Sequence, residues 1–225
     1  MKGLKIFLIS VFTILSSSLI YAQYDINFKY GAHISSVNTQ GALDAIDAVK
    51  TPILSHFVET MVGIDINPSL NISTGVSYKK KGFGLEYTIE ETILGVKVPL
   101  GIRAELDVKA VSIPLRIKYR LPISQLETYG FIGGGYTFHL NPKINTSANI
   151  IGDIEIANIP TNNIINDGET FGQIGLGLST NAGPGKFFGE VSYEHSFQNY
   201  ASNLLLDLPI RNKGITVGVG YSMPF

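Results

Sequence analysis

The stretch from Ile215 to Phe225 most constrains the fold, because it alternates with a period of two and its two faces differ. One face is apolar and the other carries only Thr, Gly, Ser and Pro. In a transmembrane barrel, lipid wets the outside of each strand, while polar side chains or water fill the inside. The stretch therefore predicts a membrane-spanning β-strand, whose apolar face is formed by Ile215, Val217, Val219, Tyr221, Met223 and Phe225.

Seven earlier segments alternate in the same way and bring the expected total to eight. Their apolar faces contain no Asp, Glu, Lys or Arg. Lipid would enforce that absence, since a basic residue at the bilayer midplane costs about 2–4 kcal/mol. The sequence therefore predicts an all-β fold, an eight-stranded antiparallel up-and-down transmembrane β-barrel with a side-chain-filled lumen. The seven segments begin near Tyr24, Val58, Leu70, Ala110, Phe131, Gln173 and Phe187.

Short and long connections alternate between these segments. The short ones cover residues 67–69, 121–128 and 181–185. The long ones cover about 36–57, 80–109, 141–171 and 196–212. Outer-membrane barrels have short periplasmic turns and long outer loops, so both chain ends are expected on the periplasmic side. Within the long connections, residues 41–49 are expected to form a short helix and residues 144–165 a mobile surface loop.

The N-terminal residues have the pattern of a secretory signal peptide. Lys2 and Lys5 precede an apolar run from Ile6 to Ile20, and the small residue Ala22 follows. We expect residues 1–22 to be a signal peptide and residues 23–225 to form the barrel domain, in the outer membrane of a Gram-negative bacterium; a retained anchor helix is the alternative. The chain has no cysteine, so neither a lipoprotein anchor nor disulfides are expected. Its net charge is −1 and it has no basic block, so nucleic acid is not an expected partner.

The polar faces of the expected strands carry charges of both signs. Eight strands enclose a space that is just wide enough for side chains, and an unpaired charge buried there would be costly. We therefore expect Arg116 and Lys118 to pair with carboxylates of the other strands, while inward glycines make room for these long side chains. A small gated pore is the alternative. The expected lumen charge network consists of Lys29, Glu59, Asp65, Arg116, Lys118, Glu190 and Glu194.

Small barrels that modify lipid A require a serine nucleophile with a base in reach. His195 is followed directly by Ser196, and adjacent strand residues point to opposite faces. His33 and His139 fall near the outer ends of inward registers, but two histidines without a third ligand make a weak metal site. We expect no catalytic residues, no metal and no cofactor. A lipid A-modifying enzyme and a soluble periplasmic carrier remain as alternatives.

Two neighbouring segments carry a resemblance to a known family. The run AVSIPLRIKYRLP covers Ala110 to Pro122, and TYGFIGGGYTFHL covers Thr128 to Leu140. An Ile-Pro-Leu strand that ends in a basic-aromatic pair, followed by a glycine-rich strand, resembles the PorT-like family of small outer-membrane barrels. The resemblance implies an outer-membrane barrel. The leading hypothesis is a structural or interaction protein of the outer membrane that presents variable surface loops. The resemblance also implies an envelope or secretion partner, although assistance to secretion belongs to few members.

The C-terminal strand also resembles the signal that the barrel-assembly machinery reads. This resemblance implies two partners, outer-membrane lipid and the assembly machinery. Pro224 departs from the pattern, because it donates no hydrogen bond to a neighbouring strand. The signal positions are Thr216, Gly218, Tyr221, Met223 and Phe225.

Overall fold

The computed structural model describes residues 23–38, 49–93, 96–123, 126–149, 153–160, 165–199 and 210–225. The expected signal peptide and almost all of the expected helix at residues 41–49 lie outside these ranges. The strands are β1 (Tyr24–Asn38), β2 (Lys50–Thr51), β3 (Ile53–Asn67), β4 (Leu70–Ile93), β5 (Val96–Ile123), β6 (Leu126–Asn149), β7 (Asp153–Pro160), β8 (Gly168–Ala182), β9 (Gly185–Ser196) and β10 (Arg211–Pro224). Within the described residues, no helix has the length and apolar character needed to cross a bilayer.

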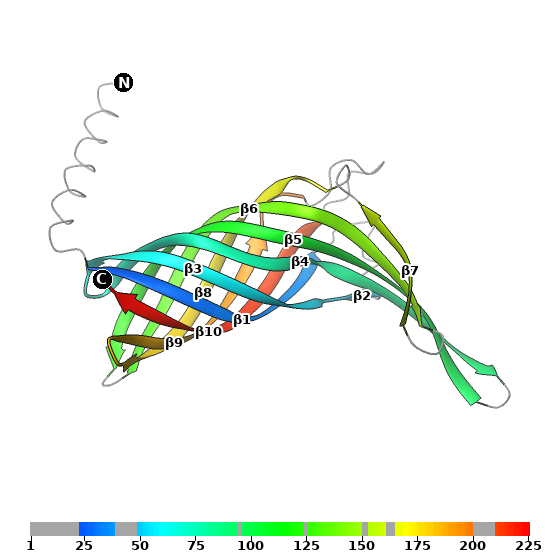
Figure 1. The fold of residues 1–225 in the computed structure, drawn as a ribbon, viewed down its shortest axis with the longest axis horizontal. Coiled ribbons are helices and arrows are strands. Elements are labelled where there is room, and N and C mark those ends of the chain that lie inside the picture. Colours follow the sequence, from blue (N-terminus) through cyan, green and yellow to red (C-terminus); the bar gives the residue numbers. More distant parts are fainter. Residues whose placement is uncertain are drawn as a thin grey trace, which may run out of the picture.

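Eight of these strands close into a ring in which every neighbour is antiparallel (Figure 1). Around the ring, β1 pairs with β3, and β4, β5, β6, β8, β9 and β10 follow in turn. The ring closes because β10 pairs with β1 from Arg211 to Pro224. Beyond Pro224, the Phe225 amide still donates to the Tyr24 carbonyl at 2.9 Å, so pairing continues past the proline. The expected eight-stranded up-and-down barrel is confirmed.

The burial pattern of the wall is that of a barrel in lipid. On β3, Val58 is 49 % exposed, whereas the next residue, Glu59, is only 6 % exposed. Apolar side chains therefore face outwards and charged side chains inwards, the reverse of a soluble domain. On β10 the outward apolar run spans Ile215 to Met223, which rises about 27 Å along the strand. A tilt of about 40° leaves roughly 21 Å of height, close to the apolar band of transmembrane barrels.

Tight turns join the strands at the end of the barrel where β1 begins and β10 ends, here called the turn end. The Asn67 side chain accepts hydrogen bonds from the amides of Ser69 and Leu70, each at 2.9 Å, and so closes the β3–β4 turn. Gly183 has φ of 62° in the β8–β9 turn, a value that glycine adopts without strain. The opposite end of the barrel is here called the loop end.

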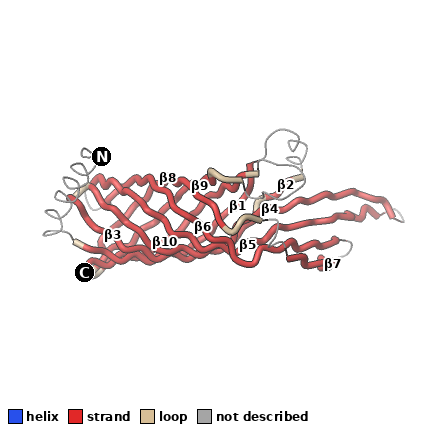
Figure 2. Tube along the Cα trace, turned by 90° about the horizontal axis from the view of Figure 1, so that it is seen from above, coloured by secondary structure: helices blue, strands red, loops and turns tan. Residues whose placement is uncertain are grey.

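The prediction of long loops at the loop end is wrong in part, because strands extend into the segments that were expected to be loops. β4 and β5 stay paired as far as Ile93 and Val96, and β6 continues to Asn149, where it pairs with β7. Residues 144–149 and 153–160 are therefore strand, not irregular loop. Paired backbones satisfy their hydrogen bonds in one another, and Leu106, Val108 and Ile165 form a small buried apolar cluster at the base of the hairpins, which project beyond the barrel (Figures 1 and 2).

A local irregularity marks where the β4–β5 hairpin leaves the wall. Gly82 has φ of 139°, and a Cβ there would lie 1.8 Å from the Leu106 carbonyl oxygen. On the facing strand, the register with β6 shifts between Asp107 and Lys109. A bulge of this kind bends the strand and increases its twist, so the hairpin turns away from the ring at this point.

Two glycines of the wall provide a matched test of packing. A Cβ on Gly31 would lie 2.1 Å from the Val217 carbonyl oxygen and 2.9 Å from the Phe57 ring. A Cβ on Gly189 would meet nothing within 4 Å. We expect Gly31→Ala to lower the free energy of unfolding by about 1–3 kcal/mol, because β1 and β10 must move apart. Gly189→Ala should stay within about 0.5 kcal/mol of the wild type. Urea unfolding in lipid vesicles measures both, and equal effects would contradict the close packing of β1 on β10.

Candidate functional site

The middle of the lumen contains four charged side chains that pair with one another. Arg116 donates to both oxygens of Glu59, at 2.8 and 2.7 Å, in a bidentate arrangement. Lys29 lies 2.7 Å from Glu59 and 2.5 Å from Glu190, and Arg116 lies 3.3 Å from Glu190. All four residues are at most 7 % exposed. Two cations and two carboxylates cancel, so this central layer satisfies its charges internally.

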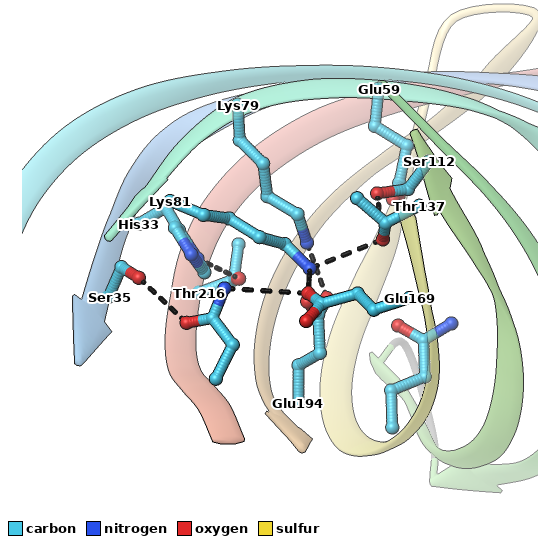
Figure 3. A network of polar contacts seen from close by, with 12 residues as sticks. His33, Ser35, Glu59, Lys79, Lys81, Ser112, Thr137, Glu169, Glu194 and Thr216 are labelled. Carbon is cyan, nitrogen blue, oxygen red and sulfur yellow. Dashed lines mark hydrogen bonds and ion pairs between the residues drawn. The ribbon is translucent and has the colours of Figure 1, made fainter. Parts of the chain in front are cut away.

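A second layer, nearer the loop end, repeats this balance (Figure 3). Lys81 lies 2.8 Å from Glu169 and 2.6 Å from Glu194. Lys79 also binds Glu194, and Lys81 donates to the Thr137 hydroxyl at 3.2 Å. The layer again joins two cations to two carboxylates, and it brings together β4, β6, β8 and β9.

Small polar side chains complete the second layer. The Ser196 hydroxyl donates to Glu169 at 2.7 Å, and the Asn212 amide donates to the same carboxylate at 3.4 Å. His33 shares a hydrogen bond of 3.0 Å with the Thr216 hydroxyl (Figure 3). These contacts tie β1 and β10 into the network, and they supply carboxylate oxygens with further donors, as a buried charge requires.

A third layer lies at the turn end around Arg120. Its guanidinium is 2.7 Å from Asp65, 3.5 Å from Asp25 and 3.7 Å from Glu127. Lys186 binds Glu127 at 2.8 Å and is 39 % exposed. This layer is therefore more open to solvent than the other two, and its ion pairs stabilise the barrel less.

Aromatic rings fill the lumen between the charged groups, and glycines on the neighbouring, paired strand make room for them. A Cβ on Gly175 would lie 2.3 Å from the Phe131 ring, and one on Gly177 would lie 2.3 Å from the Tyr129 ring. On its other side, the Phe131 ring carries the Arg116 guanidinium at 4.8 Å. Inward glycines were expected to accommodate long charged side chains; several of them accommodate rings that in turn hold cations.

The structure brings together four residues of the expected network: Lys29, Glu59, Arg116 and Glu190. Asp65 instead binds Arg120, and Glu194 binds Lys79 and Lys81. Lys118 forms no ion pair with any described residue; its ammonium lies 4.5 Å from the Tyr129 ring centre and 5.9 Å from that of Phe188.

The expected network left out four of these partners: Lys79, Lys81, Glu169 and Arg120. Lys81 continues the inward register of Lys79, and Glu169 continues that of Gln173. Both were missed because the expected strands stopped before them, in segments assigned to loops. Extending the alternation past the expected strand ends would have found them.

The expected assembly-signal residues occupy both faces of β10. Thr216 and Gly218 face the lumen, where a Cβ on Gly218 would lie 2.7 Å from the Phe57 ring. The Tyr221 hydroxyl donates to the Ala182 carbonyl at 2.8 Å. Met223 and Phe225 are 44 % and 69 % exposed on the outside. The strand therefore presents an apolar face outwards, and its role as an assembly signal stays a prediction.

His195 and Ser196 lie on opposite sides of the wall and do not contact each other. The His195 ring lies outside the wall, stacked at 6.4 Å on Tyr193, whereas Ser196 points into the lumen and binds Glu169. His139 Nε2 lies 3.7 Å from the same Glu169 carboxylate, and His139 Nδ1 donates a hydrogen bond of 2.6 Å to the Asn166 carbonyl oxygen. Among the described residues, no three potential ligands gather around a point where a metal could bind.

Several solved structures resemble this fold at low sequence identity. Neisserial surface protein A gives a TM-score of 0.46 at 11 % identity, over 91 % of this chain and 99 % of its own. The outer membrane protein OprG from Pseudomonas aeruginosa gives 0.44 at 14 % identity, over 88 % and 95 %. Ail, the attachment invasion locus protein of Yersinia pestis, gives 0.37 at 17 % identity, over 89 % and 99 %. These similarities carry no argument about function.

No family model and no curated protein matches the sequence. The resemblance to the PorT-like family therefore stays a prediction.

The pairing in the central layer predicts that the stability of the barrel depends strongly on the balance of charges there. Arg116→Met leaves two carboxylates facing one lysine, and we expect it to lower the free energy of unfolding by about 3–5 kcal/mol. Adding Glu59→Met restores the balance between Lys29 and Glu190, so the double variant should recover much of that loss. A double-mutant cycle by urea unfolding in vesicles measures the coupling. Additive effects of the two substitutions would contradict the paired arrangement.

Proposed function

We propose that this chain is an integral outer-membrane barrel of structural or interaction type, which anchors projecting hairpins at the cell surface. The observation that carries the proposal is the contrast between the two parts of the molecule. The barrel interior is filled by charge-balanced layers, whereas β4–β5 and β6–β7 extend well beyond the ring (Figure 2). A filled lumen leaves the surface hairpins as the part that can meet a partner.

The location and the partners follow from the same features. The uncharged exterior of the wall supports membrane insertion, and barrels made of strands belong to outer membranes. Short turns at the turn end support a periplasmic position for both ends of the barrel domain, with the hairpins outside. The partners are then outer-membrane lipid, the barrel-assembly machinery and, by resemblance to the PorT-like family, an envelope or secretion protein.

The proposed orientation predicts which positions a reagent can reach from outside the cell. Because the chain has no cysteine, a single introduced cysteine is a unique label site. Tyr87, on the projecting part of β4, is 61 % exposed, and Asn181 is exposed at the turn end. We expect a membrane-impermeant maleimide to label Tyr87→Cys in intact cells, and to label Asn181→Cys only after lysis. Labelling of Asn181→Cys alone in intact cells would invert the proposed orientation.

The same cells test membrane insertion itself. A folded barrel should remain with the outer-membrane fraction until detergent extracts it, and should change its electrophoretic migration only after boiling. A soluble periplasmic carrier would be released by osmotic shock and would not show the shift.

A small gated pore is the competing function. The central layer of the lumen distinguishes a pore from a filled barrel. The paired side chains of Lys29, Glu59, Arg116 and Glu190 occupy the middle of the lumen. We expect the wild type to give no steady conductance in planar bilayers, and the quadruple substitution of these residues by Ser to give open channels if it folds. Frequent openings of the wild type would favour the pore. The Val58→Ala variant, altered on the outer face only, should stay silent.

A further inference from the structure

Basic side chains gather on the outside of the barrel wall at the loop end. They occur on β4, β5 and β10, where each strand leaves the apolar band. The outward acidic residues Asp107, Glu105 and Glu86 follow farther along the β4–β5 hairpin. We call the set of basic residues the basic collar: Lys80, Lys109, Arg211 and Lys213.

Each strand places its first collar residue at the edge of the apolar band. On β4, Lys80 is the next outward position after Tyr78, and on β10 Lys213 is the next one before Ile215. Tyr78 and Ile215 are 39 % and 45 % exposed, so both still face lipid. The collar therefore sits at the level where hydrocarbon gives way to headgroups.

The turn end has no such collar among the described residues. There the outward positions are apolar, and they remain 44–59 % exposed at Leu121, Leu126, Phe187 and Met223. The long side chains of lysine and arginine can extend to the membrane interface from either end of a spanning segment. Their length therefore does not explain why they occur at one end only. The asymmetry indicates that the two leaflets present different headgroups to the wall.

The collar also lacks acidic partners within the described chain. Lys80 binds Asp107 at 2.9 Å, but Lys109, Arg211 and Lys213 form no ion pair with any described residue. Lys80 and Lys109 are direct cross-strand neighbours, and the Asp107 carboxylate that binds Lys80 offsets the repulsion between these like charges. Lys213 pairs across the sheet with His195, another nitrogen-bearing side chain on the outside.

We propose that the basic collar binds the phosphate monoesters of lipid headgroups in the leaflet at the loop end. The inference rests on the proposed membrane location and deepens it by naming the headgroup chemistry. Lysine and arginine form charge-assisted hydrogen bonds with phosphate oxygens, and clustered cations next to a membrane segment attract anionic lipid. The proposal explains why cations without an ion pair gather at this rim and why the turn end has no such group.

The test compares two lipids that differ only in phosphate. The purified full chain in detergent is titrated with diphosphoryl lipid A, or with the same lipid A after removal of its phosphates, and native mass spectrometry measures the bound fraction. We expect the wild type to prefer the phosphorylated lipid. The triple variant Lys109→Gln, Arg211→Gln, Lys213→Gln should bind it on the order of a hundredfold more weakly, since each cation near an anionic surface contributes comparably.

Two controls keep the outcome interpretable. Lys109→Arg with Lys213→Arg keeps the charge and should keep the preference, and Lys186→Gln removes a cation at the turn end and should have no effect. Equal binding of the two lipids by the wild type, or undiminished binding by the triple Gln variant, would overturn the collar proposal alone. A wild type that shows no heat-dependent shift in any detergent would overturn the proposed function, and with it this inference. Each variant is first checked for that shift.

Discussion

The structure depends on the pairing of opposite charges inside a closed ring of strands. A ring of eight strands has room for side chains but not for bulk water, so any unpaired ion in it would destabilise the barrel. The central layer meets this constraint with two cations and two carboxylates, of which Arg116 and Glu59 form a bidentate pair. The second layer solves the same problem with Lys79, Lys81, Glu169 and Glu194. Since each layer draws on several strands, the same contacts that neutralise charge also fix how the strands sit around the ring.

Glycines and aromatic rings determine where those ions can lie. A ring such as Phe131 or Tyr129 packs over a glycine of the neighbouring, paired strand, and its other side carries Arg116 or Lys118. The glycine leaves space for the ring, and the π-face of the ring contacts the cation. The cation in turn binds a carboxylate or lies near one. Phe131 is an apolar residue at an inward position of β6, and its ring contacts the Arg116 guanidinium. An apolar residue on the polar face of a barrel strand is in this molecule part of the charged network.

The fold could be predicted from the sequence because every second residue of a wall strand faces lipid and has to be apolar. The apolar faces from Ile26 to Met223 follow that rule, and so the strand number, the direction of each face and the short turns could all be read from it. The strand ends could not, because beyond the bilayer neither face has to be apolar. Residues 144–149 and 153–160 form strands that pair with each other, and the alternation of Asp153, Ile154, Glu155 and Ile156 is a period-two signal for the second of them. Partner choice in the lumen was also hidden: in the strand register Asp65 lies level with Asn71 and Lys118, yet its carboxylate binds Arg120, two residues farther along β5, and the alternation alone specifies neither contact.

The inner and outer faces of the wall differ in how their charged side chains are paired, and this contrast bears on function. Inside, the central and second layers each match two cations with two carboxylates, whereas Lys118 forms no ion pair with a described residue and the turn-end layer has more carboxylates than cations. Outside, the loop-end rim keeps Lys109, Arg211 and Lys213 without an acidic partner in the described chain, although Lys80 on the same rim has one. Their unmatched charge is most simply explained by an anion that the membrane supplies, which makes the rim, and not the lumen, the part of the barrel that recognises its surroundings.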